Sequence, residues 1–320
     1  MLALIAGEGA LPVVVADALK SQGRGVFVCE LEGHPSSVSH DTAPISFRIE
    51  QLGSLIEKLI GLGVKEICFA GRVARPALDP SAIDPQTLPL VPRMMAALQA
   101  GDDAALRVVI SFFEDAGMTV LSAHQLVPDL LPDEGVLTTS QPADQHRKDA
   151  ARGADIIAAM GAVDVGQACV VARGQALAIE ALPGTDAMLR TLLVPGKPAA
   201  TPRSDPSEGV FSDPIGWAAD WLTGEPEPTA QAGELAGTEA GAQAPVRNPA
   251  LPEGGLLVKM SKPGQDRRVD LPTIGPATIR LAALCGLDGV VIEAGGVMVL
   301  ERAEVTRLAD ELGLFLWVRP

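Results

Sequence analysis

Short apolar segments alternate with segments of helical periodicity from Leu2 to Ser122. The apolar segments have the length of buried strands and are Leu2–Ala6, Gly25–Leu31, Glu66–Ala70 and Met118–Ser122. The segments between them carry an apolar face at helical spacing and are Val13–Ser21, Gln51–Leu62, Pro92–Gln99 and Asp102–Ala116. This alternation predicts an α/β fold with helices on both faces of a parallel sheet. Ligands of such sheets bind at the carboxyl ends of the strands.

The first apolar segment ends in the glycine-bearing turn Gly7–Pro12. A dinucleotide-binding fingerprint has a third glycine or an alanine where this chain has Pro12, so nicotinamide binding is only weakly supported. Glu30 or Glu32 could still supply the carboxylate that binds a ribose in such a site. Glycines that only permit a tight turn are another alternative. We prefer binding of a nucleotide phosphate or sugar at this turn.

A second glycine turn follows the segment Glu66–Ala70. Gly71 is succeeded by Arg72 and Arg75, whose guanidinium groups have the charge and geometry to bind a diphosphate. Either arginine could equally lie in solvent on the surface. Because both glycine turns follow strands of the same predicted sheet, we expect them at one edge of that sheet, where a nucleotide would bind.

The second half of the chain predicts a mixed α/β unit. Its expected helices are Asp144–Met160, a short one from Gly184 to Leu193, Ile274–Cys285 and Arg302–Leu312. Its expected strands are the hairpin Ala168–Ala172 and Gln175–Ala181, then Gly255–Met260, Asp288–Glu293, Gly296–Leu300 and Leu314–Val318. Pro128–Pro142 has the composition of a linker or a binding loop between domains. We therefore expect a Rossmann-like nucleotide-binding domain at residues 1–143 and a mixed α/β domain at residues 144–320.

Residues 195–252 are rich in Pro, Ala, Gly and Glu and show no sustained periodicity. Such a composition buries too little apolar surface to offset the entropy lost on ordering, so we expect a long and largely disordered insertion. Pro214–Leu222 is an exception, because Trp217 and Trp221 lie four residues apart on one face of a predicted helix. That helix would rest on the protein's own surface or at a membrane interface.

The octapeptide Arg268–Gly275 places a carboxylate, Asp270, between a predicted strand end and a predicted helix start at Pro272 and Thr273. Proline suits the first turn of a helix, and threonine can cap it. Amide groups at such a helix end attract anionic oxygens. Asp270 could therefore hold a metal ion or activate water, or it could only cap the helix. The tripeptide Gly184–Asp186 repeats this arrangement and leaves the same alternatives.

The net charge of the chain and the absence of several known catalytic motifs limit the reactions that it could catalyse. A formal net charge of -15 argues against nonspecific nucleic-acid binding, which needs Lys and Arg to replace the counterions of phosphates. No apolar run is long enough to cross a bilayer, the start lacks the basic segment of a signal peptide, and the cysteines show no CxxC spacing. We therefore expect a cytoplasmic protein with reduced thiols. HExxH, GxSxG and Walker A motifs are absent, which leaves carboxylates, basic side chains and helix ends suited to phosphoryl chemistry with Mg²⁺ or Mn²⁺.

Segments from both halves of the chain resemble, in their order, those of one enzyme family. They are Leu4–Pro12, Phe69–Pro76, Gly101–Ala104, Asp164–Gln167, Glu180–Leu189 and Arg268–Gly275. The chain is similar in these segments to the UDP-2,3-diacylglucosamine pyrophosphatases of the LpxI type. The insertion at residues 195–252 is longer than this family leads us to expect.

The resemblance implies that the second domain is catalytic and that the chain is a metal-dependent hydrolase of lipid A biosynthesis in Gram-negative bacteria. Such an enzyme cleaves UDP-2,3-diacylglucosamine to UMP and 2,3-diacylglucosamine 1-phosphate with Mg²⁺ or Mn²⁺. The family's essential aspartate matches Asp270, which is expected to bind the metal and position water. The expected substrate-binding residues are Gly7, Gly9, Ala10, Leu11, Gly71, Arg72, Thr185, Asp186, Lys259, Thr273 and Ile274.

A diacylated substrate has consequences for location. Two acyl chains keep a lipid in its bilayer, so we expect transient contact of the enzyme with the inner-membrane surface, and the chain could form a homodimer. The acyl chains need an apolar slot, which the sequence does not place. Two other classes of function stay open, because a nicotinamide-dependent oxidoreductase and a noncatalytic nucleotide-sugar-binding regulator would use the same glycine turn.

Overall fold

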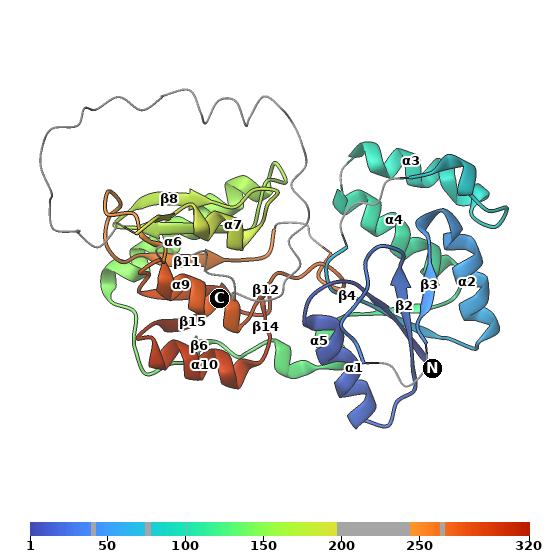
Figure 1. The fold of residues 1–320 in the computed structure, drawn as a ribbon, viewed down its shortest axis with the longest axis horizontal. Helices are drawn as coiled ribbons and strands as arrows, with labels where there is room; N and C mark the ends of the chain where they lie inside the picture. The colour runs from blue at the N-terminus through green and yellow to red at the C-terminus, as the bar shows by residue number, and fades with distance from the viewer. Residues whose placement is uncertain (40–42, 74–77, 101, 197–243, 263–265) are drawn as a thin grey trace, which may run out of the picture.

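The computed structural model describes residues 1–39, 43–73, 78–100, 102–196, 244–262 and 266–320. Two units lie side by side, the N-terminal one in blue to cyan and the C-terminal one in green to red (Figure 1). Each unit is built on its own sheet. None of the helices in the described residues has the length and apolar character needed to cross a membrane.

The first sheet is entirely parallel, in the order β3-β2-β1-β4-β5. Its strands are β1 (Leu2–Ala6), β2 (Val26–Leu31), β3 (Ile45–Phe47), β4 (Glu66–Ala70) and β5 (Thr119–Leu121). Apart from β3, each corresponds to a predicted strand, so the parallel sheet of the N-terminal half is confirmed. The sequence did not reveal β3, because three residues are too few to show a period.

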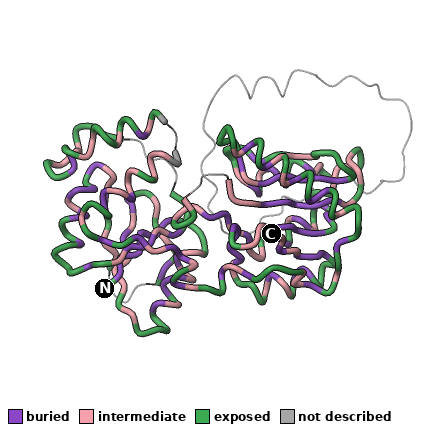
Figure 2. The backbone as a smooth tube through the Cα atoms, turned by 180° about the vertical axis from the view of Figure 1, so that it is seen from behind, coloured by how far each residue is buried: buried purple, intermediate pink, exposed green. Residues whose placement is uncertain are grey.

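Helices cover both faces of this sheet. They are α1 (Leu11–Ser21), α2 (Leu52–Gly61), α3 (Val91–Ala100), α4 (Asp102–Asp115) and α5 (Ala123–Leu126), with 3-10 turns at Ile49–Gln51, Pro80–Ala82, Leu88–Leu90 and Pro128–Leu130. Alternate residues of a strand point to opposite faces. In β1, Leu2 and Leu4 pack into one core with α1, whereas Ala3 and Ile5 pack into the other with α2 and α4. Figure 2 shows the buried backbone gathered along the strands.

The second sheet is mixed, in the order β6-β15-β13-β11-β7-β8. Its strands are β6 (Gly135–Val136), β7 (Ala168–Ala172), β8 (Gln175–Ile179), β11 (Leu256–Lys259), β13 (Gly289–Glu293) and β15 (Phe315–Arg319). β11, β13 and β15 are parallel, and antiparallel pairs flank them. The mixed character of the C-terminal unit is thus confirmed. The division at residue 143 stays a prediction, but β6 lies before it and already pairs in this second sheet.

Helices also cover both faces of the second sheet. They are α6 (Asp144–Gly161), α7 (Thr185–Arg190), α9 (Pro276–Leu284) and α10 (Arg302–Glu311). Ile157 of α6 packs with Val258 on one face, whereas Ile279 of α9 and Leu308 of α10 pack with Leu257 on the other. The four cysteines are buried free thiols, and burial raises the pKa of Cys29, Cys68 and Cys169 to about 12.

The predicted helix start at Pro272 and Thr273 is wrong. Thr273–Ile274 forms the short strand β12, which pairs in parallel with β14 (Met298–Val299). Carbonyl groups of this segment accept hydrogen bonds from Met298 and Leu300 at 2.8 and 2.9 Å. Helix α9 begins only at Pro276, and Gly275 is its N-cap. Pairing with a distant segment therefore overrides the local helix signal, and Asp270 does not cap a helix.

Most of the predicted insertion, residues 197–243, lies outside the described residues, and so does the helix predicted at Pro214–Leu222. The prediction of disorder is wrong for the end of the tract, where β10 (Val246–Arg247) pairs with β9 (Leu193–Val194). The Arg247 guanidinium donates to carbonyl groups, among them those of Cys285 and Gly254. An arginine that satisfies carbonyls at the end of α9 orders a segment whose composition favours disorder.

Candidate active site

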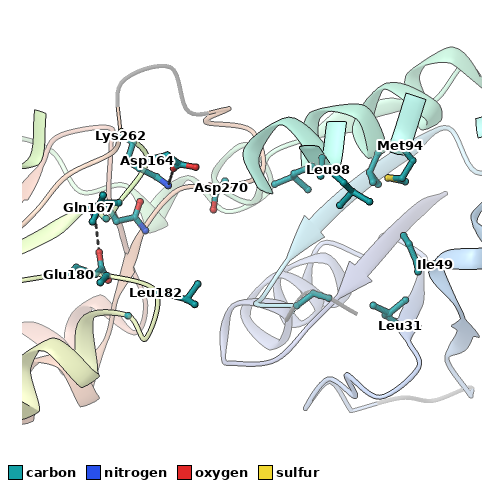
Figure 3. A pocket seen from close by; sticks show the side chains of 18 of the residues that line it. Leu31, Ile49, Met94, Leu98, Asp164, Gln167, Glu180, Leu182, Lys262 and Asp270 are labelled. Carbon is teal, nitrogen blue, oxygen red and sulfur yellow. Dashed lines mark hydrogen bonds and ion pairs between the residues drawn. The ribbon is translucent and has the colours of Figure 1, made fainter. Parts of the chain in front are cut away.

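A pocket of about 560 Å³ lies between the two units. The first unit supplies an apolar wall, formed by Leu31, Ile49, Val73, Leu78, Met94, Leu98, Ala105, Leu106 and Val109. The second unit supplies a more polar wall, formed by Asp164, Val165, Gly166, Gln167, Glu180, Ala181, Leu182, Gly184, Lys262 and Asp270. Figure 3 shows the two walls facing each other, with Met94 and Leu98 opposite Asp270 and Glu180. The site is therefore amphipathic and needs both units.

Asp270 is the predicted catalytic residue, and it lines this pocket. It lies in the segment between β11 and β12 of the second unit, yet its neighbours are anchored in the first. Val269 packs against one core of the first unit, and Leu271 belongs to the other. Arg268 forms an ion pair with Glu114 of α4 at 2.6 Å. The Asp270 backbone is thereby fixed at the junction of the two units.

Arginines also shape the segment before Asp270. Arg268 hydrogen-bonds to both carboxylate oxygens of Asp266 at 3.0 and 2.7 Å, and this lowers the pKa of Asp266 below its ordinary value. Arg267 donates to Glu293 at 2.8 Å and to the hydroxyl of Ser261 at 3.1 Å. The segment is therefore tied to the carboxyl ends of β11 and β13, which is where ligands of parallel sheets bind.

A buried polar network lies behind the polar wall. The Lys259 ammonium donates to the Thr185 hydroxyl at 2.8 Å and to the Thr273 carbonyl at 3.1 Å. The Thr185 hydroxyl donates to Glu180 at 2.5 Å, and the other Glu180 oxygen accepts from the backbone of Gln167 at 2.9 Å. The structure thus brings together three predicted substrate-binding residues, but none of those three lines the pocket. Glu180 and Gln167 line it instead.

Two other predicted residues of the second unit lie elsewhere. Asp186 follows Thr185 on α7, but its half-exposed carboxylate lies 4.0 Å from Arg190 of the same helix. Ile274 is 1% exposed and belongs to the core of the second unit. Neither lines the pocket between the units. For Ile274, contact with a substrate in this pocket would need its backbone, because its side chain faces the core.

The two glycine turns of the first unit meet each other. Glu8 and Arg72 form an antiparallel bridge. The backbone nitrogen of each donates to the carbonyl oxygen of the other, at 2.8 and 2.9 Å. A side-chain Cβ at Gly7 would lie 2.5 Å from the Arg72 carbonyl oxygen, and Gly71 adopts φ +91°. Gly9 also adopts a positive φ, +99°, with open space around it. Backbone contact between the turns is therefore enough to require glycine at positions 7 and 71. This agrees with the alternative in which the glycines only permit a tight turn.

These turns adjoin the pocket without lining it. Arg72 is exposed, with Glu8 at 3.6 Å, and the next residue, Val73, belongs to the apolar wall. Ala10 is the N-cap of α1, and Leu11 faces a much smaller pocket beside Arg268. Arg75 lies outside the described residues. The structure thus brings the residues of the two glycine turns to the edge of the site. Their contact with a ligand stays a prediction.

Several pocket residues were not singled out from the sequence. Gln167, Glu180 and Lys262 belong to the polar wall, and Asp164 pairs with Lys262 at 2.6 Å. Gln167, Glu180 and Asp164 lie in segments that carried the family resemblance, which was the available signal. The apolar wall had no signal of its own, because its residues lie on segments far apart in the sequence that only the fold brings together.

The side chains of the pocket suit a metal ion that is bound partly by the protein and partly by oxygens of a substrate. The described part of the chain has no group of three or more His, Cys, Asp or Glu side chains arranged to hold an ion. Asp270 places a carboxylate on the pocket wall, while both oxygens of Glu180 already accept hydrogen bonds. Mg²⁺ is commonly bound by one or two carboxylates together with substrate phosphates. Asp270 therefore fits such an ion if a diphosphate supplies further oxygens.

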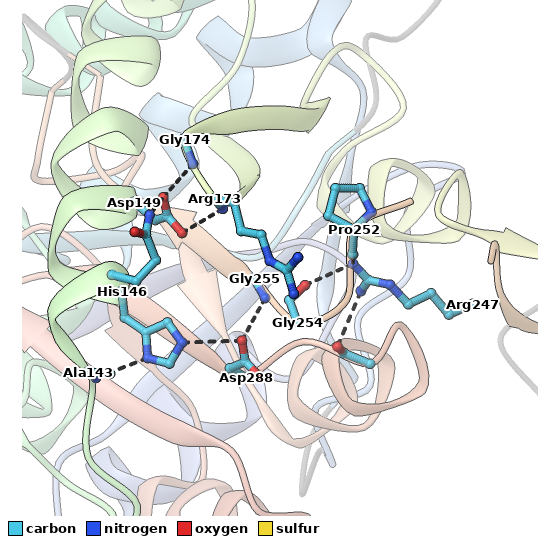
Figure 4. A network of polar contacts seen from close by, with 12 residues as sticks. Ala143, His146, Asp149, Arg173, Gly174, Arg247, Pro252, Gly254, Gly255 and Asp288 are labelled. Carbon is cyan, nitrogen blue, oxygen red and sulfur yellow. Dashed lines mark hydrogen bonds and ion pairs between the residues drawn. The ribbon is translucent and has the colours of Figure 1, made fainter. Parts of the chain in front are cut away.

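A second polar pocket of about 300 Å³ lies at the opposite end of the second sheet. Figure 4 shows His146, Asp149 and Asp288 there. The His146 Nε2 atom lies 3.3 Å from Asp288, and Asp149 accepts from the backbone N–H groups of Arg173 and Gly174 at 2.9 and 2.7 Å. These contacts join α6 to the β7–β8 turn and to the start of β13. They hold the sheet together at its amino ends.

Comparisons with known proteins agree with the resemblance seen in the sequence. The model of the LpxI N-terminal domain matches residues 1–130, and that of the LpxI C-terminal domain matches residues 133–197 and 233–317. A solved structure of a short-chain dehydrogenase/reductase superfamily protein from Agrobacterium tumefaciens, with bound NAD, is 18% identical to this chain and has a TM-score of 0.20. The match covers 44% of this chain and 38% of the dehydrogenase chain.

A curated relative extends over the whole chain. The UDP-2,3-diacylglucosamine pyrophosphatase LpxI of Caulobacter vibrioides is 34% identical over 317 residues, which are 98% of this chain and 96% of the relative. Both domain models occur in the expected order, and the relative leaves almost no part of either chain unmatched. The chain therefore belongs to the LpxI family.

Proposed function

We propose that this chain hydrolyses the diphosphate of UDP-2,3-diacylglucosamine, giving UMP and 2,3-diacylglucosamine 1-phosphate in lipid A biosynthesis. Family membership and the activity named for the Caulobacter relative support this proposal. The observation that carries it is the pocket itself, which has an apolar wall from one unit and a polar wall with Asp270 from the other. A glycolipid joined to a nucleotide by a diphosphate has the same two-sided chemistry.

The apolar wall supports a place for the acyl chains. Met94 and Leu98 of α3 and Leu106 and Val109 of α4 line it without a polar atom in their side chains. Burying a methylene group is worth about 0.8 kcal/mol, so an acyl chain gains substantially from such a wall. The acylated sugar would lie between the units, with its diphosphate turned towards Asp270.

The nucleotide would lie towards the glycine turns. We propose that the first unit binds nucleotide as a Rossmann-like domain does, because its order β3-β2-β1-β4-β5 matches five of the six strands of that fold, whose ligands lie at the carboxyl ends of the strands. Gly7, Gly9 and Gly71 are at those ends, and Arg72 would meet phosphate charge there. The neighbouring Ala10 and Leu11, at the start of α1, would contact the nucleoside.

Asp270 would orient the attacking water at the α-phosphate and hold Mg²⁺ or Mn²⁺. When bound, the ion would neutralise charge on the diphosphate oxygens and make the phosphorus more electrophilic. Arg72 would add positive charge near the diphosphate, and acyl chains bound along the apolar wall would exclude water from that side of the pocket. Attack at the α-phosphate transfers the water oxygen to UMP and leaves the second phosphate on the sugar.

A substrate with two acyl chains stays anchored in a bilayer, so the enzyme would work from the cytoplasm at the inner-membrane surface. We also propose a homodimer as its assembly. Vesicle flotation, with and without substrate lipid, tests the first proposal, and light scattering tests the second.

The direct test of function is UMP release from UDP-2,3-diacylglucosamine, with and without added Mn²⁺. Reaction in H₂¹⁸O should place the label on UMP, whereas label on the lipid product would mean attack at the other phosphorus. Binding without UMP release would favour a nucleotide-sugar-binding regulator. An absorbance band of a bound nicotinamide cofactor, with hydride transfer, would favour an oxidoreductase.

A further inference from the structure

Lys259 joins separate parts of the second unit through one buried ammonium group. It is the last residue of β11 and is 7% exposed. The ammonium donates to Thr185 on α7 at 2.8 Å and to the carbonyl of Thr273 on β12 at 3.1 Å. β11 and β12 belong to different sheets, and α7 packs over a face of the larger one. These contacts point into the protein, so Lys259 is built to hold structure rather than to touch substrate.

A carboxylate one hydroxyl away offsets the charge of this ammonium. Glu180 is 6% exposed and accepts from the Thr185 hydroxyl at 2.5 Å. Burial lowers the pKa of Lys259, while the negative charges of Glu180 and Asp186 raise it. A buried charge without a partner would be strongly destabilising, whereas a charge within a satisfied network is tolerated. Glu180 therefore keeps a buried lysine compatible with the fold.

Thr185 has to be a hydroxyl residue for this arrangement to exist. Its oxygen accepts a hydrogen bond from Lys259 and donates one to Glu180, and only a hydroxyl does both. Valine has nearly the same shape but would break both bonds. Serine would keep both bonds but lose the methyl group. The two substitutions therefore separate the polar role of Thr185 from its packing role.

The backbone that receives the Lys259 bond leads directly to Asp270. Within the described residues, the two-residue strand β12 pairs only with β14, and Pro272 before it has no N–H to donate. On its other side, Asp270 is tied to the first unit through Arg268 and Val269. We infer that Glu180, Thr185 and Lys259 form a positioning relay that fixes the backbone at Thr273 and thereby the carboxylate of Asp270. The inference rests on the proposed function for the role of Asp270.

Paired variants of Thr185 test the relay. Thr185→Val should lower kcat about thirtyfold while KM changes less than about threefold. The reason is that a misplaced catalytic carboxylate stabilises the transition state less but leaves substrate binding nearly unchanged. Thr185→Ser should retain most of the turnover. Thr191→Val is a matched control, since within the described residues the hydroxyl of this C-cap residue bonds only to the carbonyl of Met188 in the same helix. Equal losses in the Val and Ser variants, or a rise in KM at constant kcat, would overturn the relay.

A measurement that needs no substrate complements the kinetics. Hydrogen–deuterium exchange of residues 266–275 should become faster in Thr185→Val than in Thr185→Ser or in the Thr191→Val control. Unchanged exchange would contradict the relay even if activity falls. If the wild-type chain releases no UMP, the proposed function fails, whereas the exchange data still decide whether Thr185 holds this segment.

Glu180→Gln provides a second variant that keeps the shape and an acceptor for the Thr185 hydroxyl. It removes the negative charge that raises the pKa of Lys259, so that pKa should fall further. The alkaline limb of the kcat profile should then move to lower pH, because the relay needs a charged Lys259. A variant whose alkaline limb stays at the wild-type pH would show that the charge of Lys259 has no part in positioning Asp270.

Discussion

Arg268 and Glu114 form an ion pair of 2.6 Å between the two units, two residues before Asp270. Val269 and Leu271 pack into the cores of the first unit, whereas Arg267 hydrogen-bonds to Glu293 of the second unit, so both units hold this segment. The rest of the polar wall belongs to the second unit. Opening of the units would therefore strain the segment that carries Asp270, and we expect turnover to depend on the relative position of the units.

This coupling predicts a salt-sensitive effect of Glu114. Glu114→Gln should lower kcat about two- to fivefold and cost less than about 1 kcal/mol of stability, since partly exposed ion pairs are weak but this one orients the Asp270 segment. The wild-type kcat should approach that of the variant at high salt, because ions screen the pair. Turnover measured at low and high NaCl gives the result, and an unaltered kcat at low salt would show that the pair orients nothing.

Asp270→Asn is the sharpest substitution in the pocket. It keeps the side-chain shape and removes the charge, so substrate should still bind while kcat falls by roughly three powers of ten or more. Steady-state kinetics at saturating Mn²⁺, with a binding assay, check both parts. Near wild-type kcat would remove Asp270 from the chemistry. The Glu114→Gln variant serves as the comparison for a displacement without loss of this charge.

Asp266 should make stability depend on pH. The hydrogen bond from Arg268 holds the pKa of Asp266 below its ordinary value of 3.8, so the folded state favours the charged carboxylate. A carboxyl group whose pKa is lower in the folded than in the unfolded state stabilises the fold at any pH above its pKa in the unfolded state. That stability is lost as the pH falls through the pKa of the folded state. Urea unfolding should therefore show the wild type to be more stable than Asp266→Asn at pH 7, with the difference shrinking below pH 3.8. A difference that is independent of pH would contradict this account.

Arg247 should contribute to folding although it follows the long Pro- and Ala-rich tract. Its guanidinium bonds to carbonyls at the end of α9 and in the turn before β11. Arg247→Ala should therefore lower the free energy of unfolding by about 2 kcal/mol. Arg190→Ala is the control, since its partner Asp186 is half exposed and 4.0 Å away. Equal unfolding free energies for these two variants would show that the Arg247 bonds add nothing.

The sequence predicted elements whose signal is local. β4 was predicted with its observed bounds, Glu66–Ala70, because an apolar run of strand length stops at a glycine. β12 was missed because Pro272 and Thr273 favour a helix start locally, while their partner β14 lies on another segment. β10 was missed because the composition around it favours disorder, while the contacts of Arg247 and Leu251 that oppose this tendency are tertiary.

The sequence led to one residue that lines the pocket, Asp270. The octapeptide alone left a helix cap as an alternative for Asp270, and the family resemblance favoured a catalytic role, which stays a prediction. The hydrogen bond between Lys259 and Thr185 was not predictable, since a residue type does not reveal whether a side chain faces a ligand or a buried partner. The apolar wall was likewise hidden, because Leu31 and Met94 become neighbours only after the sheet and α3 assemble.

The strand order of the second unit also governs when that unit can form during synthesis. β15 ends at Arg319 and lies inside the sheet, between β13 and β6. The five strands of the first sheet, by contrast, are all present once Leu121 has been made. The first sheet can therefore assemble on the ribosome, whereas the second must wait until residue 319 has emerged from the exit tunnel. The pocket between the units consequently forms only after the second sheet is complete.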